Sequence, residues 1–114
     1  MNTPQRDSGY LTDMQIAIAK IHRYTEGMTL EDFLLNELVQ DAVLRNLAII
    51  GEAVSKLSDS LTVQHPDVPW QNIAGMRNRL VHDYNGVNLR LVWNTVRQVI
   101  PSFLATIQAL RAGE

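Results

Sequence analysis

Apolar residues recur at helical spacing along most of the chain. In residues 11–24 an apolar side chain returns every three or four positions, and the same period holds over a longer segment, residues 37–57. A third apolar stripe, in residues 89–107, keeps nearly ideal spacing. No window shows the sustained alternation of apolar and polar positions that a half-buried strand needs. The pattern therefore predicts an all-α bundle of four to five helices with short connections.

Residues with special backbone or capping properties mark the predicted helix ends. Thr29 and Asp32 have the three-residue spacing of an N-cap arrangement that would open a short helix, and Gly27 is a suitable stop for the helix before it. Asn88 can cap the last helix. Pro101 should kink that helix, because proline removes one backbone donor and crowds the carbonyl four residues earlier.

Composition favours one globular domain without thiol chemistry. The 114 residues are 46% hydrophobic and 19% charged, and none is cysteine, so disulfides and thiolate metal sites are excluded. We expect a single domain over residues 1–114. The N-terminus lacks a secretory pattern, and no apolar run approaches the roughly 18 residues of a membrane span. We therefore expect a cytoplasmic protein.

Charge is unevenly distributed along the sequence. The formal net charge of −2 argues against a protein that holds nucleic acid by bulk electrostatics. Residues 76–112 nevertheless carry five arginines and a single acid, Asp83, whereas five acids crowd residues 26–41. One part of the molecule is thus better suited than the other to face phosphate.

The segment GMRNRLVHDYNGV, residues 75–87, places several polar side chains on a helix that we expect to run to about Tyr84. On an ideal helix, with about 100° per residue, Arg77 falls among the residues that face the core, where an unpaired guanidinium is costly. Arg77 and His82 are then about 140° apart. A shared site would require the helix to loosen near Val81, or a second subunit to bring its copy alongside.

The polar residues of this segment can support RNA cleavage without a metal. In the last helical turn His82 would be favoured in its charged form by the helix dipole, which suits acid–base chemistry near neutral pH. Arg77 could stabilise charge building on phosphorus, and Asn78 could orient the imidazole or the phosphate. The structural alternative is that His82 only caps the helix and that Arg77 pairs with an acid such as Glu52. These physical arguments alone leave both the catalytic and the structural interpretation open.

Residues 77–84, RNRLVHDY, match the Arg-x4-His-x-Tyr motif of the HEPN superfamily, and the chain specifically resembles the HepT-like toxins. The resemblance covers nearly the whole chain. It is carried by YTEGMT at 24–29, DAVLRNLAIIGEAVSKLS at 41–58, HPDVPWQNIAGMRNRLVHDYNGV at 65–87 and VWNTV at 92–96. It implies an α-helical HEPN bundle that forms a homodimer, with two motifs across a shared cleft.

The resemblance also implies an activity and a partner. HepT-like dimers are metal-independent endoribonucleases, toxic when unrestrained, and no cofactor is expected. They are paired with a minimal nucleotidyltransferase, an MntA-like antitoxin, with which they could form a larger hetero-oligomer. By position, Arg77 would stabilise the transition state, His82 would be the acid–base group and Asn78 would support it. Tyr84 matches the tyrosine that the antitoxin modifies with AMP.

The RNA that the resemblance implies as substrate could be a tRNA or an mRNA. Further polar residues could extend the catalytic cleft that binds it. They are Arg79, Arg45, Asn46 and Glu52. For the last three, an internal salt bridge and hydrogen bonds are the structural alternative. For the chain as a whole, the alternative function is a non-catalytic subunit that binds a partner or substrate for the nucleotidyltransferase.

Overall fold

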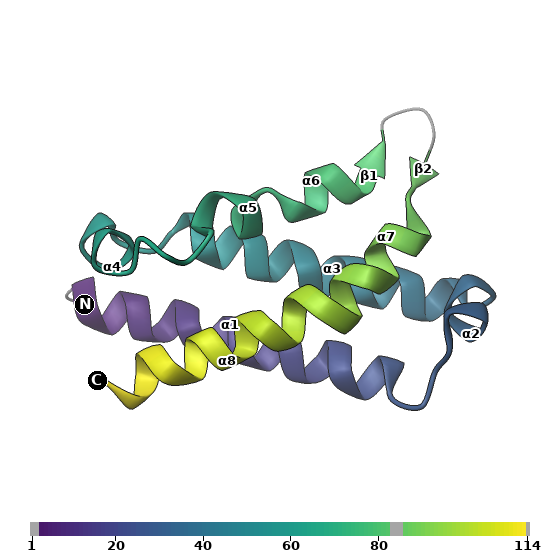
Figure 1. Ribbon diagram of the computed structural model, residues 1–114, viewed down its shortest axis with the longest axis horizontal. Coiled ribbons are helices and arrows are strands. Elements are labelled where there is room, and N and C mark those ends of the chain that lie inside the picture. The colour runs from purple at the N-terminus through teal and green to yellow at the C-terminus, as the bar shows by residue number, and fades with distance from the viewer. Residues whose placement is uncertain (1–2, 83–85, 114) are drawn as a thin grey trace.

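Two long antiparallel helices form the base of the bundle. The computed structural model describes residues 3–82 and 86–113, except for the side chain at position 82. Helices α1 (Thr3–Thr25) and α3 (Glu37–Ser55) pack side by side along their length, and the short α2 (Leu30–Leu34) joins them at one end (Figure 1). Within the described ranges, no helix combines the length and hydropathy needed to cross a bilayer.

A second layer covers this pair. It begins with the short helices α4 (Asp59–Gln64), α5 (Trp70–Ala74) and α6 (Met76–Leu80). The chain then forms a small antiparallel hairpin of β1 (Val81–His82) and β2 (Gly86–Val87), which projects from the bundle (Figure 1). The C-terminal run lies across α1 and α3 and consists of α7 (Leu89–Asn94), the π-helical segment η1 (Thr95–Val99) and α8 (Ile100–Ala112).

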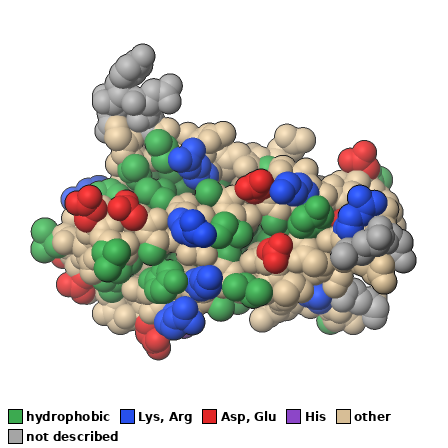
Figure 2. All heavy atoms as spheres, turned by 180° about the vertical axis from the view of Figure 1, so that it is seen from behind, with side chains coloured by type: hydrophobic (Ala, Val, Ile, Leu, Met, Phe, Trp, Pro, Cys, Tyr) green, Lys and Arg blue, Asp and Glu red, His purple; other side chains and the backbone are tan. Residues whose placement is uncertain are grey.

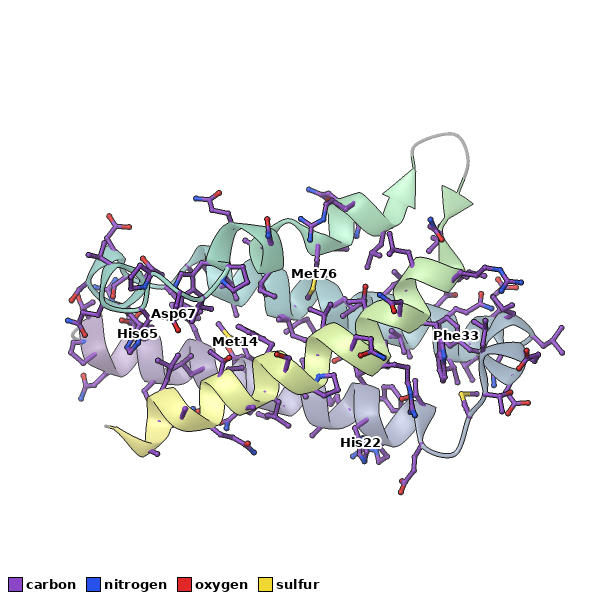
Figure 3. All side chains as sticks on the ribbon, viewed as in Figure 1. Met14, His22, Phe33, His65, Asp67 and Met76 are labelled. Carbon is purple, nitrogen blue, oxygen red and sulfur yellow. The ribbon has the colours of Figure 1, made fainter. Side chains whose placement is uncertain are left out.

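The core fills the space between the two layers with aliphatic and aromatic side chains. Met14 of α1 and Phe33 of α2 are fully buried, and Met76 of α6 is 3% exposed, so residues from both layers reach the same core (Figure 3). Phe33 also stacks on Trp93 of α7, with ring centroids 5.2 Å apart. Burial of these side chains is the main force that holds the short helices in place, because helices of five residues are not stable alone.

The predicted helix ends are confirmed at the residues that signalled them. Thr29 accepts a hydrogen bond from the backbone N–H of Asp32, and the Asp32 carboxylate accepts one from the N–H of Thr29. Gly27 adopts φ +76°, a conformation open to glycine but costly for other residues. The Asn88 side chain accepts from the N–H of Leu91 at 3.1 Å and caps α7.

Pro101 changes the last helix in a specific way. The backbone N–H of Ile100 donates to the carbonyl of Thr95, five residues earlier, so the turn before Pro101 is wider than an α-helical turn. A wider turn gives room for the proline ring, which would crowd the carbonyl of Arg97 in a regular helix. The proline is thus accommodated by a π-helical turn within a continuous run, and the predicted kink stays a prediction.

The prediction of one helix running to Tyr84 is wrong. Gly75 separates α5 from α6, and the helix ends at Leu80 because Val81 is extended, with φ −111° and ψ 122°. Helix α4 and the hairpin were also not predicted, and the chain divides more finely than the four to five expected helices. These elements are too short to produce a periodic pattern.

One close contact fixes α5 on α3. A Cβ atom built on Gly51 of α3 would lie 2.8 Å from the carbonyl oxygen of Ala74 and 3.3 Å from that of Ile73. Glycine therefore lets the backbones of the two helices approach more closely than a side chain allows. This contact sets the height at which α5, and the α6 segment after it, lie above the base of the bundle.

Candidate active site

The polar segment occupies α6 and the start of the hairpin. Met76 and Leu80, four residues apart, are buried and anchor α6 to the core, and the three residues between them are exposed. Those exposed residues are Arg77, Asn78 and Arg79. A helix of five residues with two apolar anchors can therefore present three consecutive polar side chains to solvent.

The expected place of Arg77 in the core is wrong. The side chain is exposed and, within the described part of the chain, makes no hydrogen bond or ion pair. The expectation assumed one uninterrupted helix with Ile73 at the centre of its buried face. The helix breaks at Gly75, and the buried face of the new helix α6 is formed by Met76 and Leu80. A guanidinium in this position needs no internal partner and is available to an anionic ligand.

The chain leaves the helix between Arg77 and His82. Helix α6 stops at Leu80, and the backbone of His82 lies in β1, paired with Gly86. Of the two alternatives for a shared site, the loosening of the helix near Val81 is observed, so the 140° separation of the ideal helix no longer applies. The other alternative, a second subunit alongside, stays a prediction. The expectation that His82 lies in the last helical turn is wrong, because its backbone lies in β1, so the argument from the helix dipole loses its premise. The side chain of His82 and the whole of Tyr84 lie outside the described residues.

Asn88 closes the base of the hairpin. Its backbone N–H donates to the carbonyl oxygen of Leu80 at 2.9 Å, while its side chain caps α7. The end of α6 and the start of α7 are thereby joined by one residue, and the four backbone positions of the strand pair are held in register. The hairpin therefore projects from a fixed base.

Arg79 bridges the break between α5 and α6. Its Nη2 donates to the carbonyl oxygen of Asn72 at 2.7 Å, and its Nη1 lies 3.5 Å from the position that a Cβ on Gly75 would take. It also lines a pocket of about 320 Å³ between the α5–α6 segment and the α7–η1 segment. Arg79 thus helps to set the orientation of α6 and of the exposed face that carries Arg77. The sequence had suggested instead that Arg79 extends the cleft. The glycine inside a helical pattern was the available signal for this break.

The three α3 residues proposed to extend the cleft have separate environments. Arg45 is exposed, Asn46 is 4% exposed and donates from Nδ2 to the carbonyl oxygen of Ala42 at 2.8 Å, and Glu52 pairs with Lys56 at 3.3 Å. Asn46 and Glu52 therefore make the internal hydrogen bond and the salt bridge that were the alternative to a role in the cleft. Among the described residues, no hydrogen bond or ion pair links any of the three to Arg77 or Asn78.

Figure 2 shows acidic and basic side chains interspersed on the face opposite to that of Figure 1, with several of the acids near the end that carries α2. That end holds the exposed acids Glu31, Asp32 and Glu37. The charge segregation expected from the sequence stays a prediction for the surface as a whole. Among the described residues, no three His, Cys, Asp or Glu side chains lie close enough to hold a metal ion. The charged side chains that α6 itself exposes are the cations Arg77 and Arg79.

Comparison with known proteins places this all-α domain among ribonuclease-like proteins. Residues 14–110 match the family described as "Ribonuclease HepT-like". A protein named "Probable ribonuclease HepT" from Thermococcus cleftensis is 41% identical over 102 residues, which cover 90% of this chain and 93% of that relative. The chain belongs to the HepT-like ribonuclease family.

Two further relatives agree with this assignment. A protein provisionally named as an RNase from Caldanaerobacter subterraneus subsp. tengcongensis is 45% identical over 89 residues, covering 78% of this chain and 80% of the relative. A second protein provisionally named as an RNase, from Methanocaldococcus jannaschii, is 33% identical over 108 residues. These residues cover 94% of this chain and 89% of that relative. No solved structure gives a significant match.

Proposed function

We propose that this protein is a metal-independent endoribonuclease and the toxin of a toxin–antitoxin pair. The observation that supports it most is the Arg-x4-His-x-Tyr motif, which spans the junction of α6 and the hairpin in a chain of the HepT-like family. The exposed Arg77 and Asn78 are suited to meet RNA directly, since neither side chain is used by the core. The ribonuclease names of the relatives support the same reaction class.

The proposed reaction is attack of a ribose 2′-hydroxyl on the adjacent phosphorus. His82 accepts the 2′-hydroxyl proton as the new O–P bond forms, and the bond from phosphorus to the 5′-oxygen breaks. The leaving oxygen takes a proton from a protonated group, which gives a 2′,3′-cyclic phosphate and a free 5′-hydroxyl. Arg77 stabilises the charge that builds on the phosphoryl oxygens, and Asn78 supports the imidazole or the phosphate.

A homodimer would supply the second acid–base group. One chain carries one motif histidine, whereas the reaction needs one group to remove a proton and one to donate it. A two-fold dimer that brings two copies of the hairpin together would place His82 and the partner copy across one cleft. The end of α6 at Leu80 supports this arrangement, because it frees the motif histidine from the helix that carries Arg77.

RNA cleavage by matched variants tests the proposal. Purified wild-type protein, His82→Ala and His22→Ala would be incubated with total RNA and with a defined tRNA in excess chelator, and the cleaved ends mapped. His22 is an exposed histidine of α1 and serves as the control. We expect cleavage with 2′,3′-cyclic ends from wild type and His22→Ala, and none from His82→Ala. Equal cleavage by a folded His82→Ala protein would refute the catalytic role, and no cleavage by any folded protein would favour the partner-binding subunit.

Regulation is proposed to occur at Tyr84. A minimal nucleotidyltransferase partner would attach AMP to this tyrosine, and the added negative charge and bulk would oppose RNA phosphate. Mass spectrometry of the co-expressed pair should show added AMP on the peptide that contains Tyr84, together with reduced RNA cleavage. Full inhibition of a protein whose Tyr84 carries no AMP would show instead that the partner inhibits by docking.

A further inference from the structure

A groove lies between α1 and the η1–α8 run. Its volume is about 540 Å³, and its floor is apolar, formed by Ile18 of α1 with Val96, Ile100 and Leu104 of the C-terminal run. Figure 3 places His22, on its rim, on the opposite side of the bundle from the hairpin. The volume falls within the range of small-molecule sites, which is about 300–1,000 Å³. This groove is thus separate from the segment proposed to cleave RNA.

The π-helical turn contributes one wall of the groove. Val96 and Arg97 belong to η1, and Pro101, which follows the turn, also lines the groove. The hydrogen bond from Ile100 to Thr95 shows that the turn is wound more widely than an α-helix at this point. Such turns are often found where a helix contributes to a binding site, because they redirect side chains away from their regular positions.

Arg97 gives the rim of the groove a fixed positive charge. Among the described residues that line the groove, Arg97 and His22 are the ionisable ones, and none is Asp or Glu. The Arg97 guanidinium lies 5.5 Å from the centroid of the Trp93 ring and is exposed. Stacking on Trp93 limits the positions that this cation takes, and within the described part of the chain it has no carboxylate partner. In a protein of net charge −2, this uncompensated positive rim favours an anion.

We propose that the groove binds a monomeric amphipathic carboxylate of the size of a medium-chain fatty acid. The aliphatic chain lies along the floor, where it removes apolar surface from water, and the carboxylate accepts hydrogen bonds from the Arg97 guanidinium. Charge complementarity selects this class, because the apolar floor alone would accept an uncharged chain equally well. The binding does not depend on ribonuclease activity.

Binding of three probes with the same ten-carbon chain tests the charge requirement. Decanoate, decanol and decyltrimethylammonium, each below its micelle concentration, would be titrated into the full-length protein and followed by calorimetry and by NMR shifts of groove residues. We expect one decanoate per chain, with weaker binding of decanol and the weakest binding of the cation. Equal affinity for decanoate and decanol, or no binding of decanoate, would overturn the proposal.

Matched variants locate the site and exclude an alternative occupant. Arg97→Gln should raise the decanoate dissociation constant by about tenfold and leave that of decanol unchanged, since it removes one charge-assisted contact. Arg90→Gln removes an exposed arginine of α7 that does not line the groove, and its affinity should equal that of wild type. Ala19→Trp, at an exposed lining position, should abolish binding by filling the groove. If Ala19→Trp instead changes the oligomeric state and decanoate does not bind, the groove is an interface between copies.

Discussion

The close approach of α3 and α5 at Gly51 predicts that a single methyl group destabilises the protein. In Gly51→Ala the new Cβ would lie 2.8 Å from a backbone carbonyl oxygen of α5, a distance that real Cβ atoms essentially never show. The helices would have to separate, because the neighbouring atom is backbone and cannot rotate away. Overpacking of this kind costs about 1–3 kcal/mol.

Helix propensity acts in the opposite direction, so a control variant is needed. Replacing glycine by alanine inside a helix gains about 1 kcal/mol. Gly9 lies within α1 and is exposed, and a Cβ added there would meet nothing within 4 Å, so Gly9→Ala should show that gain alone. Gly51→Ala should be less stable than wild type by up to about 2 kcal/mol, and the two variants should differ by the steric cost of about 1–3 kcal/mol.

Urea unfolding at a fixed protein concentration measures both effects. The unfolding midpoint should rise for Gly9→Ala and fall for Gly51→Ala, with similar slopes if the denatured state is unchanged. RNA cleavage by Gly51→Ala should also fall, because α5 determines where α6 presents Arg77. A Gly51→Ala protein as stable as Gly9→Ala would refute the reasoning, since it would show that the contact between the helices adapts without cost.

Two further substitutions test contacts that pattern analysis did not find. Ser58 caps α4, and its backbone N–H and hydroxyl both donate to the carboxylate of Asp7. Ser58→Ala should therefore lower the free energy of unfolding, measured by urea titration, by about 1–3 kcal/mol. An unchanged free energy of unfolding would mean that water replaces these hydrogen bonds. Arg79→Ala removes the hydrogen bond to the Asn72 carbonyl and should cost only about 0.5–1.5 kcal/mol, while reducing RNA cleavage by loosening α6. Cleavage at the wild-type rate by that variant would show that the bridge has no positioning role.

The long helices could be predicted from the sequence because their signals are repeated over several turns. Helix α3 begins and ends within two residues of the prediction, and the capping residue Thr29 and the stop at Gly27 act as their chemistry requires. The short elements could not be predicted in this way. Helices α5 and α6 each have only five residues, and the direction of their apolar face depends on contacts with α3 rather than on their own period.

Residue type and spacing were enough to select the candidate site residues. They were not enough to predict how the structure arranges those residues. The motif singled out Arg77, but the ideal-helix geometry placed this residue in the core because it treated Gly75 as an ordinary helical residue. The role of Arg79 as a bridge depends on where the carbonyl of Asn72 lies, which is a tertiary fact. Spacing along a sequence gives the angle between two residues only while the helix between them is continuous.

The exposure of α6 between its two buried anchors has a consequence for the history of such a protein. Because Arg77 and Asn78 contribute nothing to the core, either can be replaced at almost no cost in stability. A copy that loses the proposed RNA cleavage by substitution at these positions would still fold and express. Folding alone therefore exerts no selection to preserve the two polar side chains, and an inactive descendant would keep the same fold.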